Sequence, residues 1–321
     1  MSKRALVIGI NDYAKIKPLR GCVNDAHNIG SLISKNADNS RNFDTKMLTS
    51  ENGNQVTKKD IKAAVTTLLT KPADMAFLYF SGHGTATNLG GYLCAYDTEA
   101  YDEGFSMQEL LALINQAPIK EIVVILDCCQ SGALGEVPSL GQTGISFIKE
   151  GTSILTASRS DESAMEVNGA GIFTSLICDA LSGSAADLLG VVTPAGVYSH
   201  VEQSFSAWDQ RPLFKSYVSR STCLRMATPK VDLKLLRDIP ILFADADRNH
   251  NMDPSYEHSH RAAKTENIEK FKGLKKLQTA GLIHVNRKGD PDLYYAALEN
   301  ASCKLSPLGR FYWHLASAGK L

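Results

Sequence analysis

Short apolar runs alternate with segments of helical spacing through the first two thirds of the chain. The apolar runs are residues 5–10, 75–80, 121–126 and 153–157. Runs of this length between polar segments are typical of buried strands. Between and after them, apolar residues recur every three to four positions over residues 23–35, 58–70, 107–115 and 172–182, which indicates helices. Thr57 and Ser106 precede two of these helices as N-caps. This alternation predicts an α/β fold with a mostly parallel sheet covered by helices on both faces.

The pattern changes near residue 226, where a polar, aspartate-rich stretch begins. It leads into a helical segment, "TENIEKFKGLKKLQTA", then two extended runs, "LIHV" and "LYYAAL", around the turn "RKGDPD", and a terminal helix, "LGRFYWHL". The order helix, hairpin, helix predicts a small winged-helix-like domain. The sequence therefore predicts a first domain over residues 1–225, a linker over 226–262 and the winged-helix-like domain over 263–321.

Composition narrows the class of protein. No apolar run approaches the roughly 20 residues of a membrane span, and the chain enters its first strand without a signal peptide, so we expect a cytoplasmic protein. Seven cysteines without framework spacing favour reduced thiols. The first 225 residues carry 19 basic and 23 acidic residues and the remainder 15 and 11, giving formal charges of −4 and +4. Neither part is basic enough to indicate nucleic-acid binding from charge alone.

Reactive residue types follow two of the predicted strands. The run 75–80 ends in "SGHG", residues 81–84, and the run 121–126 ends in "DCCQSG", residues 127–132. Reactive groups of parallel sheets gather beyond the carboxyl ends of strands. If the backbone stays extended, Ser81 and His83 point the same way, Asp127 and Cys129 share a face, and Cys128 points oppositely. This alternation nominates Cys129 as the reactive thiol and Cys128 as a small core residue.

A cysteine and a histidine at adjacent strand ends are the minimum set for thiol nucleophilic catalysis. Gly82 and Gly84 leave the backbone open beside the histidine, so we expect the amides of Gly84 and Cys129 to face an oxyanion. Either motif alone also fits a loop histidine or an ordinary strand-end thiol. Their occurrence together after two strands favours catalysis.

These motifs resemble those of the caspase and metacaspase superfamily of cysteine peptidases. Beyond "SGHG" and "LDCCQSG", the stretches "ALVIGINDY", "LRGCVNDAHNI", "ILTASRSDESAME", "GIFTSLICDAL" and "DQRPLF" follow the order and approximate spacing of prokaryotic caspase-like domains. The resemblance covers roughly residues 1–225. It implies a caspase-like fold and a catalytic dyad of His83 and Cys129, with no third catalytic residue.

The resemblance to metacaspases also implies a substrate pocket. Its residues are Cys22, Asp25, Ser81 and Asp127. Two carboxylates beneath the thiol would hold an arginine or lysine side chain, and arginine gains bidentate geometry, so we expect cleavage after basic residues. Asp25 also fits an acid in the first turn of a helix. Arg20 lies near the position of an arginine with which animal caspases accept aspartate, which leaves an aspartate preference as the alternative.

Metal binding is expected to play no necessary part. Many metacaspases bind calcium through acids after the catalytic histidine, and Asp97, Asp102 and Glu103 lie in that region. The chain has "FSMQEL" where the family often carries paired aspartates, so calcium remains an open possibility.

Two further stretches have ligand-like residues. The stretch 245–253 alternates oxygen ligands like an EF-hand loop, but His250 takes the glycine position and Tyr256 the glutamate position. It is therefore interpreted as a solvated linker. His250, His258 and His260 have no thiol at ligand spacing and are interpreted as surface histidines.

The predicted second domain suggests regulation or partner binding. Four lysines of its predicted first helix either face DNA or form the solvent-exposed face of an amphipathic helix, and we favour the solvent-exposed face. These lysines are Lys270, Lys272, Lys275 and Lys276. Protein substrates and a regulatory protein partner are expected, and a membrane is not. Lys149 is the only basic residue in the loop after the nucleophile, which predicts autocleavage after Lys149.

The prokaryotic pattern of a compact peptidase with an appended module resembles effectors of bacterial stress or antiviral defence. The competing class is a non-catalytic signalling or DNA-binding protein that keeps the caspase-like fold. Such proteins usually lose the cysteine or the histidine, and this chain has both.

Overall fold

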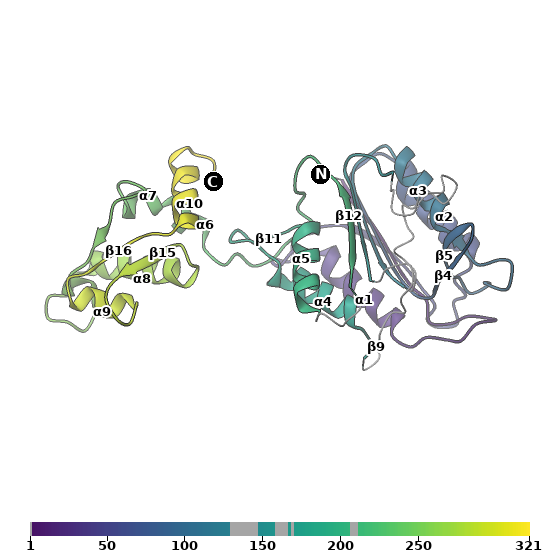
Figure 1. The fold of residues 1–321 in the computed structure, drawn as a ribbon, viewed down its shortest axis with the longest axis horizontal. Helices are drawn as coiled ribbons and strands as arrows, with labels where there is room; N and C mark the ends of the chain where they lie inside the picture. The colour runs from purple at the N-terminus through teal and green to yellow at the C-terminus, as the bar shows by residue number, and fades with distance from the viewer. Residues whose placement is uncertain (1, 129–146, 158–165, 168–169, 206–210) are drawn as a thin grey trace. The chain divides into compact units, whose positions relative to one another are not determined.

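The computed structural model describes residues 2–128, 147–157, 166–167, 170–205 and 211–321. The chain forms two compact units, each drawn in Figure 1. The first comprises Met1–Ala186 and Val191–Thr228, and the second comprises Asp187–Gly190 and Pro229–Leu321. The main division at residues 228 and 229 lies close to the predicted end of the first domain.

A six-stranded sheet forms the centre of the first unit. Its strands are β1 (Lys3–Gly9), β2 (Asp44–Thr49), β3 (Ala73–Ser81), β7 (Ile119–Asp127), β8 (Thr152–Thr156) and β12 (Leu213–Tyr217). Their order in the sheet is β12-β8-β7-β3-β1-β2, and only β12 is antiparallel to its neighbour. The four predicted strands are β1, β3, β7 and β8. The pattern missed β2 and β12, edge strands whose residues are mostly exposed or half-buried.

Helices cover both faces of this sheet, which confirms the predicted α/β class. They are α1 (Cys22–Ser34), α2 (Lys58–Thr70), α3 (Met107–Gln116), α4 (Ile172–Asp179) with a π-helical turn at Ala180–Ser184, and α5 (Pro194–Ser204). In Figure 1, α2 and α3 lie on one side of the sheet and α1, α4 and α5 on the other. Thr57 forms a capping box with Asp60 at α2, and the Ser106 side chain caps α3, as predicted.

Strand alternation divides the apolar side chains between two cores. Leu6 and Ile8 of β1 pack in the core that includes α2 and α3 side chains, whereas Ala5 and Val7 pack in the core with α1 and α4. Because side chains alternate along a strand, each central strand supplies both cores.

Small strands complete the first unit. A three-stranded antiparallel sheet follows β3 and consists of β4 (Gly84–Thr87), β5 (Gly90–Leu93) and β6 (Phe105–Ser106). Two short pairs are β9 (Glu166–Val167) with β10 (Ala170–Gly171), and β11 (Val191–Val192) with β13 (Arg225–Met226).

Arg225 of β13 is a buried cation that joins the ends of two helices. Its Nε donates to the carbonyls of Leu32 and Lys35, at 2.8 and 2.9 Å, where α1 ends. Its Nη1 donates to the Leu181 carbonyl, at 2.7 Å, in the π-helical turn. One guanidinium group therefore satisfies three terminal carbonyls that helices leave unpaired.

The second unit has its own core and a three-stranded antiparallel sheet in the order β14-β16-β15. Its elements are α6 (Leu233–Arg237), α7 (Ile239–Leu242), β14 (His250–Asn251), a 3₁₀ turn at Pro254–Tyr256, α8 (Thr265–Thr279), β15 (Ile283–Asn286), α9 (Leu293–Leu298), β16 (Ser302–Leu305) and α10 (Pro307–Ser317). The segment expected as a linker, 226–262, differs from that expectation. It carries α6 and α7, and Leu236 and Phe243 are buried in this core.

The prediction of an extended run at "LYYAAL" was wrong, because residues 293–298 form helix α9. Asp292 caps this helix by accepting a hydrogen bond from the Tyr294 amide, and the buried residues Leu293, Ala296 and Ala297 have helical spacing. The strand of this region is β16. The winged-helix-like assignment stays a prediction.

Across the parts of the chain that the structure describes, no helix combines the length and apolar character needed to cross a membrane.

Candidate active site

Three central strands end at the same level of the sheet, so their polar ends lie side by side. The register pairs Gly9 of β1 with Ser81 of β3, and Ser81 with Asp127 of β7. Beyond the strands, the Gly82 amide donates to the Asp127 carbonyl at 3.3 Å. Ser81 and Gly82 of the first motif therefore lie beside Asp127, the first residue of the second motif, as predicted. Cys129 lies outside the described residues, and Cys128 is the last described residue before it.

His83 is held from two sides by the loop after β1. Its backbone amide donates to the Tyr13 hydroxyl at 2.8 Å, and that hydroxyl donates to the Ile10 carbonyl at 3.1 Å. The Tyr13 and His83 rings lie 4.9 Å apart between centroids. Burial raises the pKa of Tyr13 far above its usual value, so the hydroxyl keeps its proton. The loop therefore fixes both the backbone and the ring of His83.

The imidazole tautomer follows from the contact of Nε2. This nitrogen lies 2.8 Å from the Lys17 backbone carbonyl. Because a carbonyl only accepts hydrogen bonds, Nε2 must carry the proton, and Nδ1 is then the basic nitrogen of the neutral ring. Sequence reasoning missed the Lys17 carbonyl because a backbone acceptor leaves no mark on residue identity.

The predicted alternation of side chains does not continue past Ser81. The backbone bends at Gly82, Ser81 contacts Asp25, and His83 packs on Tyr13. A Cβ atom at Gly82 would lie 2.8 Å from the Tyr13 hydroxyl and 2.9 Å from the Phe80 ring, so glycine is needed at this bend.

Cys128 has the role predicted for it. The residue is 1% exposed and packs in the apolar core that includes α2 and α3 side chains. Cys128 is therefore a small core residue.

The backbone amide of Gly84, the first residue of β4, points away from the neighbouring strand β5. The Cys94 amide donates to the His83 carbonyl at 2.9 Å, and Gly84 faces Leu93 in the register of β4 and β5. Since hydrogen-bonded and non-hydrogen-bonded pairs alternate in an antiparallel ladder, the Gly84 amide points outward from β5. Its role as an oxyanion donor stays a prediction.

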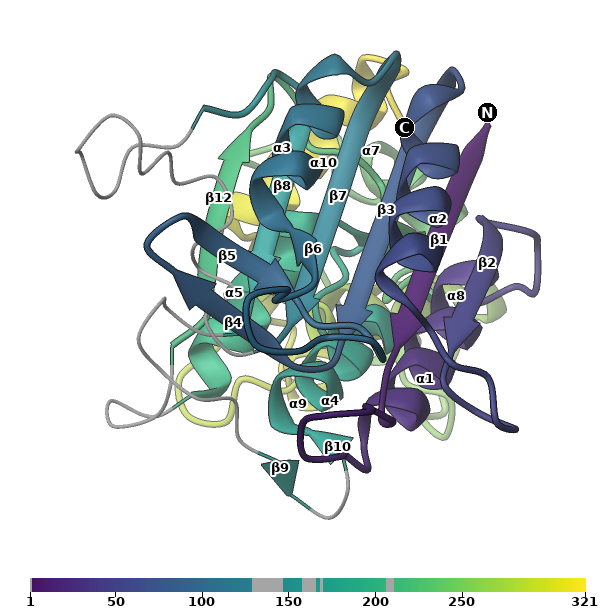
Figure 2. The same cartoon turned by 90° about the vertical axis from the view of Figure 1, so that its right-hand side faces the viewer.

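Two buried carboxylates converge on Gly171, the residue that precedes α4. Asp25 is 2% exposed and Asp127 is 7% exposed. The Gly171 amide donates to Asp25 Oδ2 at 3.2 Å, and the Ser81 hydroxyl reaches the same oxygen at 3.5 Å. A Cβ atom at Gly171 would lie 2.5 Å from Asp127 Oδ2 and 3.4 Å from Asp25 Oδ2. The structure thus brings together three of the four predicted pocket residues, with α1, α4 and β10 at one end of the sheet in Figure 2.

Both interpretations of Asp25, as a pocket carboxylate and as an acid in the first turn of α1, are compatible with the start of this helix. Asn11 Oδ1 accepts from the amides of Cys22 and Val23, at 3.0 and 3.4 Å, and so caps the helix. Asp25 also lies in the first turn, but its contacts are with Gly171 and Ser81. Cys22, the fourth predicted residue, is buried at the first position of α1.

The surrounding groups experience the negative charge of these carboxylates. Burial raises the pKa of Tyr79 well above its ordinary value, and the charges of Asp127 and Asp25 raise it further. Burial also raises the pKa of Cys178 to about 12, with added effects of Asp25 and Asp179. Cys178 therefore stays a thiol at neutral pH and does not compete as a nucleophile.

Lys149 lies at the end of the sheet where β7 begins, opposite to the end where His83 lies. Its Nζ donates to the carbonyls of Ala117 and Ile119, both at 2.7 Å, where β7 begins. A strand of the length of β7 spans about 30 Å, which separates this ammonium group from the strand end beside His83. Cleavage after Lys149 stays a prediction.

The acids considered for calcium mostly serve Lys58. Asp97 accepts a hydrogen bond from the Lys58 amide at 2.8 Å, and Asp102 forms an ion pair with the Lys58 ammonium group. Among the residues with described positions, no group of three or more histidine, cysteine or acidic side chains is placed to hold a metal ion. The expectation that no metal is required stays a prediction, with calcium as the alternative.

His250 is not the surface histidine that was expected. It is half-buried, Nδ1 donates to the Leu242 carbonyl at 2.7 Å, and Nε2 lies 3.0 Å from the Tyr256 hydroxyl. Both ring nitrogens are therefore used within the core of the second unit.

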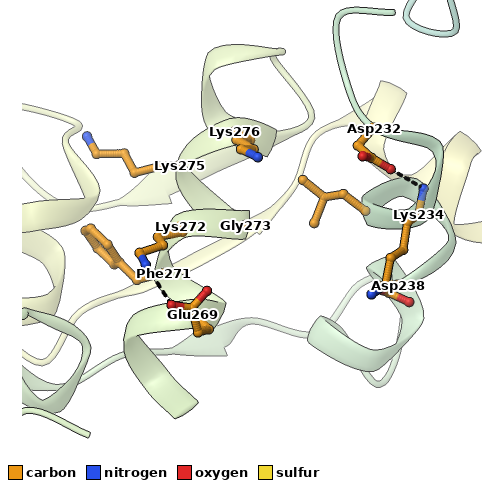
Figure 3. Close-up of a pocket in the computed structure, with 10 residues that line it drawn as sticks. Asp232, Lys234, Asp238, Glu269, Phe271, Lys272, Gly273, Lys275 and Lys276 are labelled. Atoms are coloured by element: carbon orange, nitrogen blue, oxygen red, sulfur yellow. Dashed lines mark hydrogen bonds and ion pairs between the residues drawn. The ribbon is translucent and has the colours of Figure 1, made fainter. Parts of the chain in front are cut away.

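A groove of about 670 Å³ runs between α6 and α8 in the second unit (Figure 3). It is lined by acids, lysines and the apolar side chains Leu235 and Phe271, without a cysteine or histidine. Three α8 lysines form ion pairs with carboxylates: Lys270 with Glu266, Lys272 with Glu269, and Lys275 with Asp292. This pairing favours the solvent-facing interpretation of the helix over DNA binding.

A histidine held by the loop after β1, with two buried acids at neighbouring strand ends, is the arrangement expected of a cysteine peptidase site. Residues 2–223 match the family model for the caspase domain. Because the match spans well over half of the chain, the protein belongs to the caspase-domain family.

Curated relatives agree with this assignment, and a solved structure agrees with the fold. Metacaspase-1A of Aspergillus terreus is 31% identical over 160 residues, 44% of this chain and 38% of that protein. Metacaspase-7 of Arabidopsis thaliana is 32% identical over 146 residues, 42% of this chain and 36% of that protein. The chain thus spans well under half the length of these relatives. A crystal structure of a Geobacter sulfurreducens protein is similar in fold, with a TM-score of 0.52 and 15% identity over 71% of this chain and 98% of that one.

Proposed function

We propose that the protein is an endopeptidase that uses His83 and Cys129 to cleave protein chains after basic residues, with arginine preferred over lysine. One observation carries the proposal. Two buried carboxylates, Asp25 and Asp127, face the same backbone position at the strand ends beside His83.

In the proposed reaction, the Cys129 thiol transfers its proton to His83 Nδ1, and the sulfur bonds to the scissile carbonyl carbon. The Lys17 carbonyl keeps the proton on Nε2 and so keeps Nδ1 available. When the C–N bond breaks, the proton passes to the leaving amine, and water then hydrolyses the thioester.

The oxyanion of the tetrahedral intermediates would face the amides of Gly84 and Cys129. The outward direction of the Gly84 amide supports this role. The loss of one oxyanion donor typically costs about 2.7–4 kcal/mol of transition-state stabilisation.

Specificity follows from the negative charge of the Asp25 and Asp127 carboxylates. Two buried carboxylates favour a cation, because buried charges are costly unless they are paired. A guanidinium group binds carboxylates through two parallel hydrogen bonds, whereas an ammonium group acts as a point charge, so arginine is favoured. The alternative preference for aspartate has weaker support, since Arg20 is exposed on the loop before α1 and the two carboxylates repel an acid.

The proposal is tested with fluorogenic peptides that end in arginine, lysine or aspartate, assayed with calcium or with a chelator. Cleavage after arginine that is lost in Cys129→Ala and His83→Ala supports the proposal. Cleavage only after aspartate overturns the specificity, and wild-type activity in Cys129→Ala overturns the mechanism.

The proposal extends to a cytoplasmic effector whose second unit regulates the peptidase or recruits a protein partner. Bacterial stress or antiviral defence is the proposed setting, by similarity of the domain pattern. Capture of new N-termini in cells that express wild type or Cys129→Ala tests this part and identifies the substrates.

A further inference from the structure

We infer that Tyr79 and Thr174 are specificity-positioning residues, which fix the Asp127 carboxylate through a buried hydrogen-bond network in front of Gly171. The inference rests on the proposed function, since it concerns the same pair of carboxylates, Asp25 and Asp127. Neither residue belongs to the motifs of the dyad or to the pocket residues predicted from the sequence.

The direction of the network follows from the hydrogens available. The Thr174 hydroxyl donates to Asp127 Oδ2 at 2.5 Å, and the Tyr79 hydroxyl lies 2.5 Å from Thr174 Oγ1. A threonine hydroxyl has one hydrogen, which is used on the carboxylate, so Tyr79 must be the donor to Thr174. Tyr79 and Thr174 are both buried, at 0% and 1% exposed. The network therefore ends on an acceptor and stabilises the ionised form of Asp127.

The same segment brings a second contact to the other carboxylate. Gly171 precedes α4, and Thr174 is the third residue of that helix. The Gly171 amide holds Asp25 Oδ2 at 3.2 Å while Thr174 holds Asp127. One four-residue stretch thus orients both acids, although it lies 146 residues from Asp25 and 47 from Asp127 in sequence.

A fixed carboxylate matters most for a planar substrate group. Bidentate binding of a guanidinium group requires the carboxylate to keep one orientation, whereas an ammonium group tolerates rotation. Loss of the Thr174 hydrogen bond should therefore weaken the use of arginine more than the use of lysine.

The test compares Thr174→Val, Tyr79→Phe and Thr174→Ser in the full chain. A buried hydrogen bond to a charged group is worth roughly tenfold or more in binding. We expect Thr174→Val to raise KM for the arginine peptide about tenfold with kcat nearly unchanged, and to lower the arginine-to-lysine ratio. Tyr79→Phe should act in the same direction more weakly, and Thr174→Ser should retain wild-type values.

The pH profile gives a readout that a merely structural role would not move. A hydrogen bond to a carboxylate lowers its pKa, so its removal raises the pKa of Asp127 and moves the acid limb of kcat/KM to higher pH. Thr152→Val is the matched control, because Thr152 is 0% exposed and its hydroxyl has no hydrogen-bond partner among the described residues. This control should leave KM, the ratio and the pH profile unchanged.

The outcomes separate the inference from the proposed function. If wild type cleaves after arginine, Asp127→Asn loses this activity, and Thr174→Val keeps the wild-type KM, ratio and pH profile, the inference is overturned and the proposed function stands. If wild type cleaves no basic peptide, the proposed function fails. The network is then judged by the carboxyl ¹³C titration of Asp127, where equal pKa values in wild type and Thr174→Val overturn it. Should Thr174→Val fail to fold, Tyr79→Phe carries the same comparisons.

Discussion

Replacement of Tyr13 by phenylalanine should weaken both the fold and catalysis, because its hydroxyl is the link between His83 and the loop after β1. The hydroxyl accepts from the His83 amide at 2.8 Å and donates to the Ile10 carbonyl at 3.1 Å. Tyr13 is 9% exposed, so water does not readily replace these bonds. A buried donor left without a partner costs about 1–3 kcal/mol. We expect Tyr13→Phe to lose this much free energy of unfolding.

The catalytic consequence should be separable from the loss of stability. With its amide released, His83 should hold its productive position less well, which lowers kcat about tenfold. KM should change little, because the Asp25 and Asp127 carboxylates are not altered. Urea unfolding measures the first effect, and steady-state cleavage of an arginine peptide well below the unfolding temperature measures the second.

Tyr96→Phe is the matched control. The Tyr96 hydroxyl accepts from exposed Gln55 Nε2 at 3.0 Å, and surface changes of this kind usually alter stability by less than about 0.5 kcal/mol. The reasoning is refuted if Tyr13→Phe unfolds at the wild-type urea concentration and retains the wild-type kcat.

Three further predictions follow from particular contacts. Gly171→Ala should raise KM for arginine peptides at least tenfold, because the added methyl group would lie 2.5 Å from Asp127 Oδ2; an unchanged KM would contradict the pocket geometry. Lys149→Met should reduce the free energy of unfolding by about 1–3 kcal/mol, because the carbonyls of Ala117 and Ile119 lose their donor; an unchanged urea midpoint would contradict this structural role. Burial lowers the pKa of His250 below 6.5, so the second unit should be fully stable above that pH and lose stability as the pH falls below it. Chemical unfolding at about pH 7.5 and about pH 5.5 measures this loss. His250→Gln should remove it, and the same loss of stability in His250→Gln would show that His250 is not its cause.

The sequence predicted most of the first unit because its signals are local. Continuous apolar runs marked β1, β3, β7 and β8, and helical spacing with Thr57 and Ser106 as caps marked α2 and α3. The edge strand β2 escaped because only one face of it contacts the core, which leaves no continuous apolar run. Helix α9 was misread because a six-residue apolar run has no clear period, and its cap at Asp292 was overlooked.

The site was predicted as residue types and completed only by long-range contacts. The ends of β3 and β7 indicated His83 and Asp127, since parallel strands end at one edge. The Lys17 carbonyl, the Gly171 amide and the Thr174 hydroxyl come from distant segments. Their positions depend on tertiary packing, which no local pattern encodes.

Arg225 bears on how the first unit should be shortened for separate study. The family match stops at residue 223, whereas this buried guanidinium, 8% exposed, follows two residues later. A truncation at the end of the match would strand three helix-end carbonyls in the interior and loosen the far end of α1, whose near end holds Asp25. An isolated caspase-domain fragment should therefore retain the chain through Thr228, where its compact unit ends.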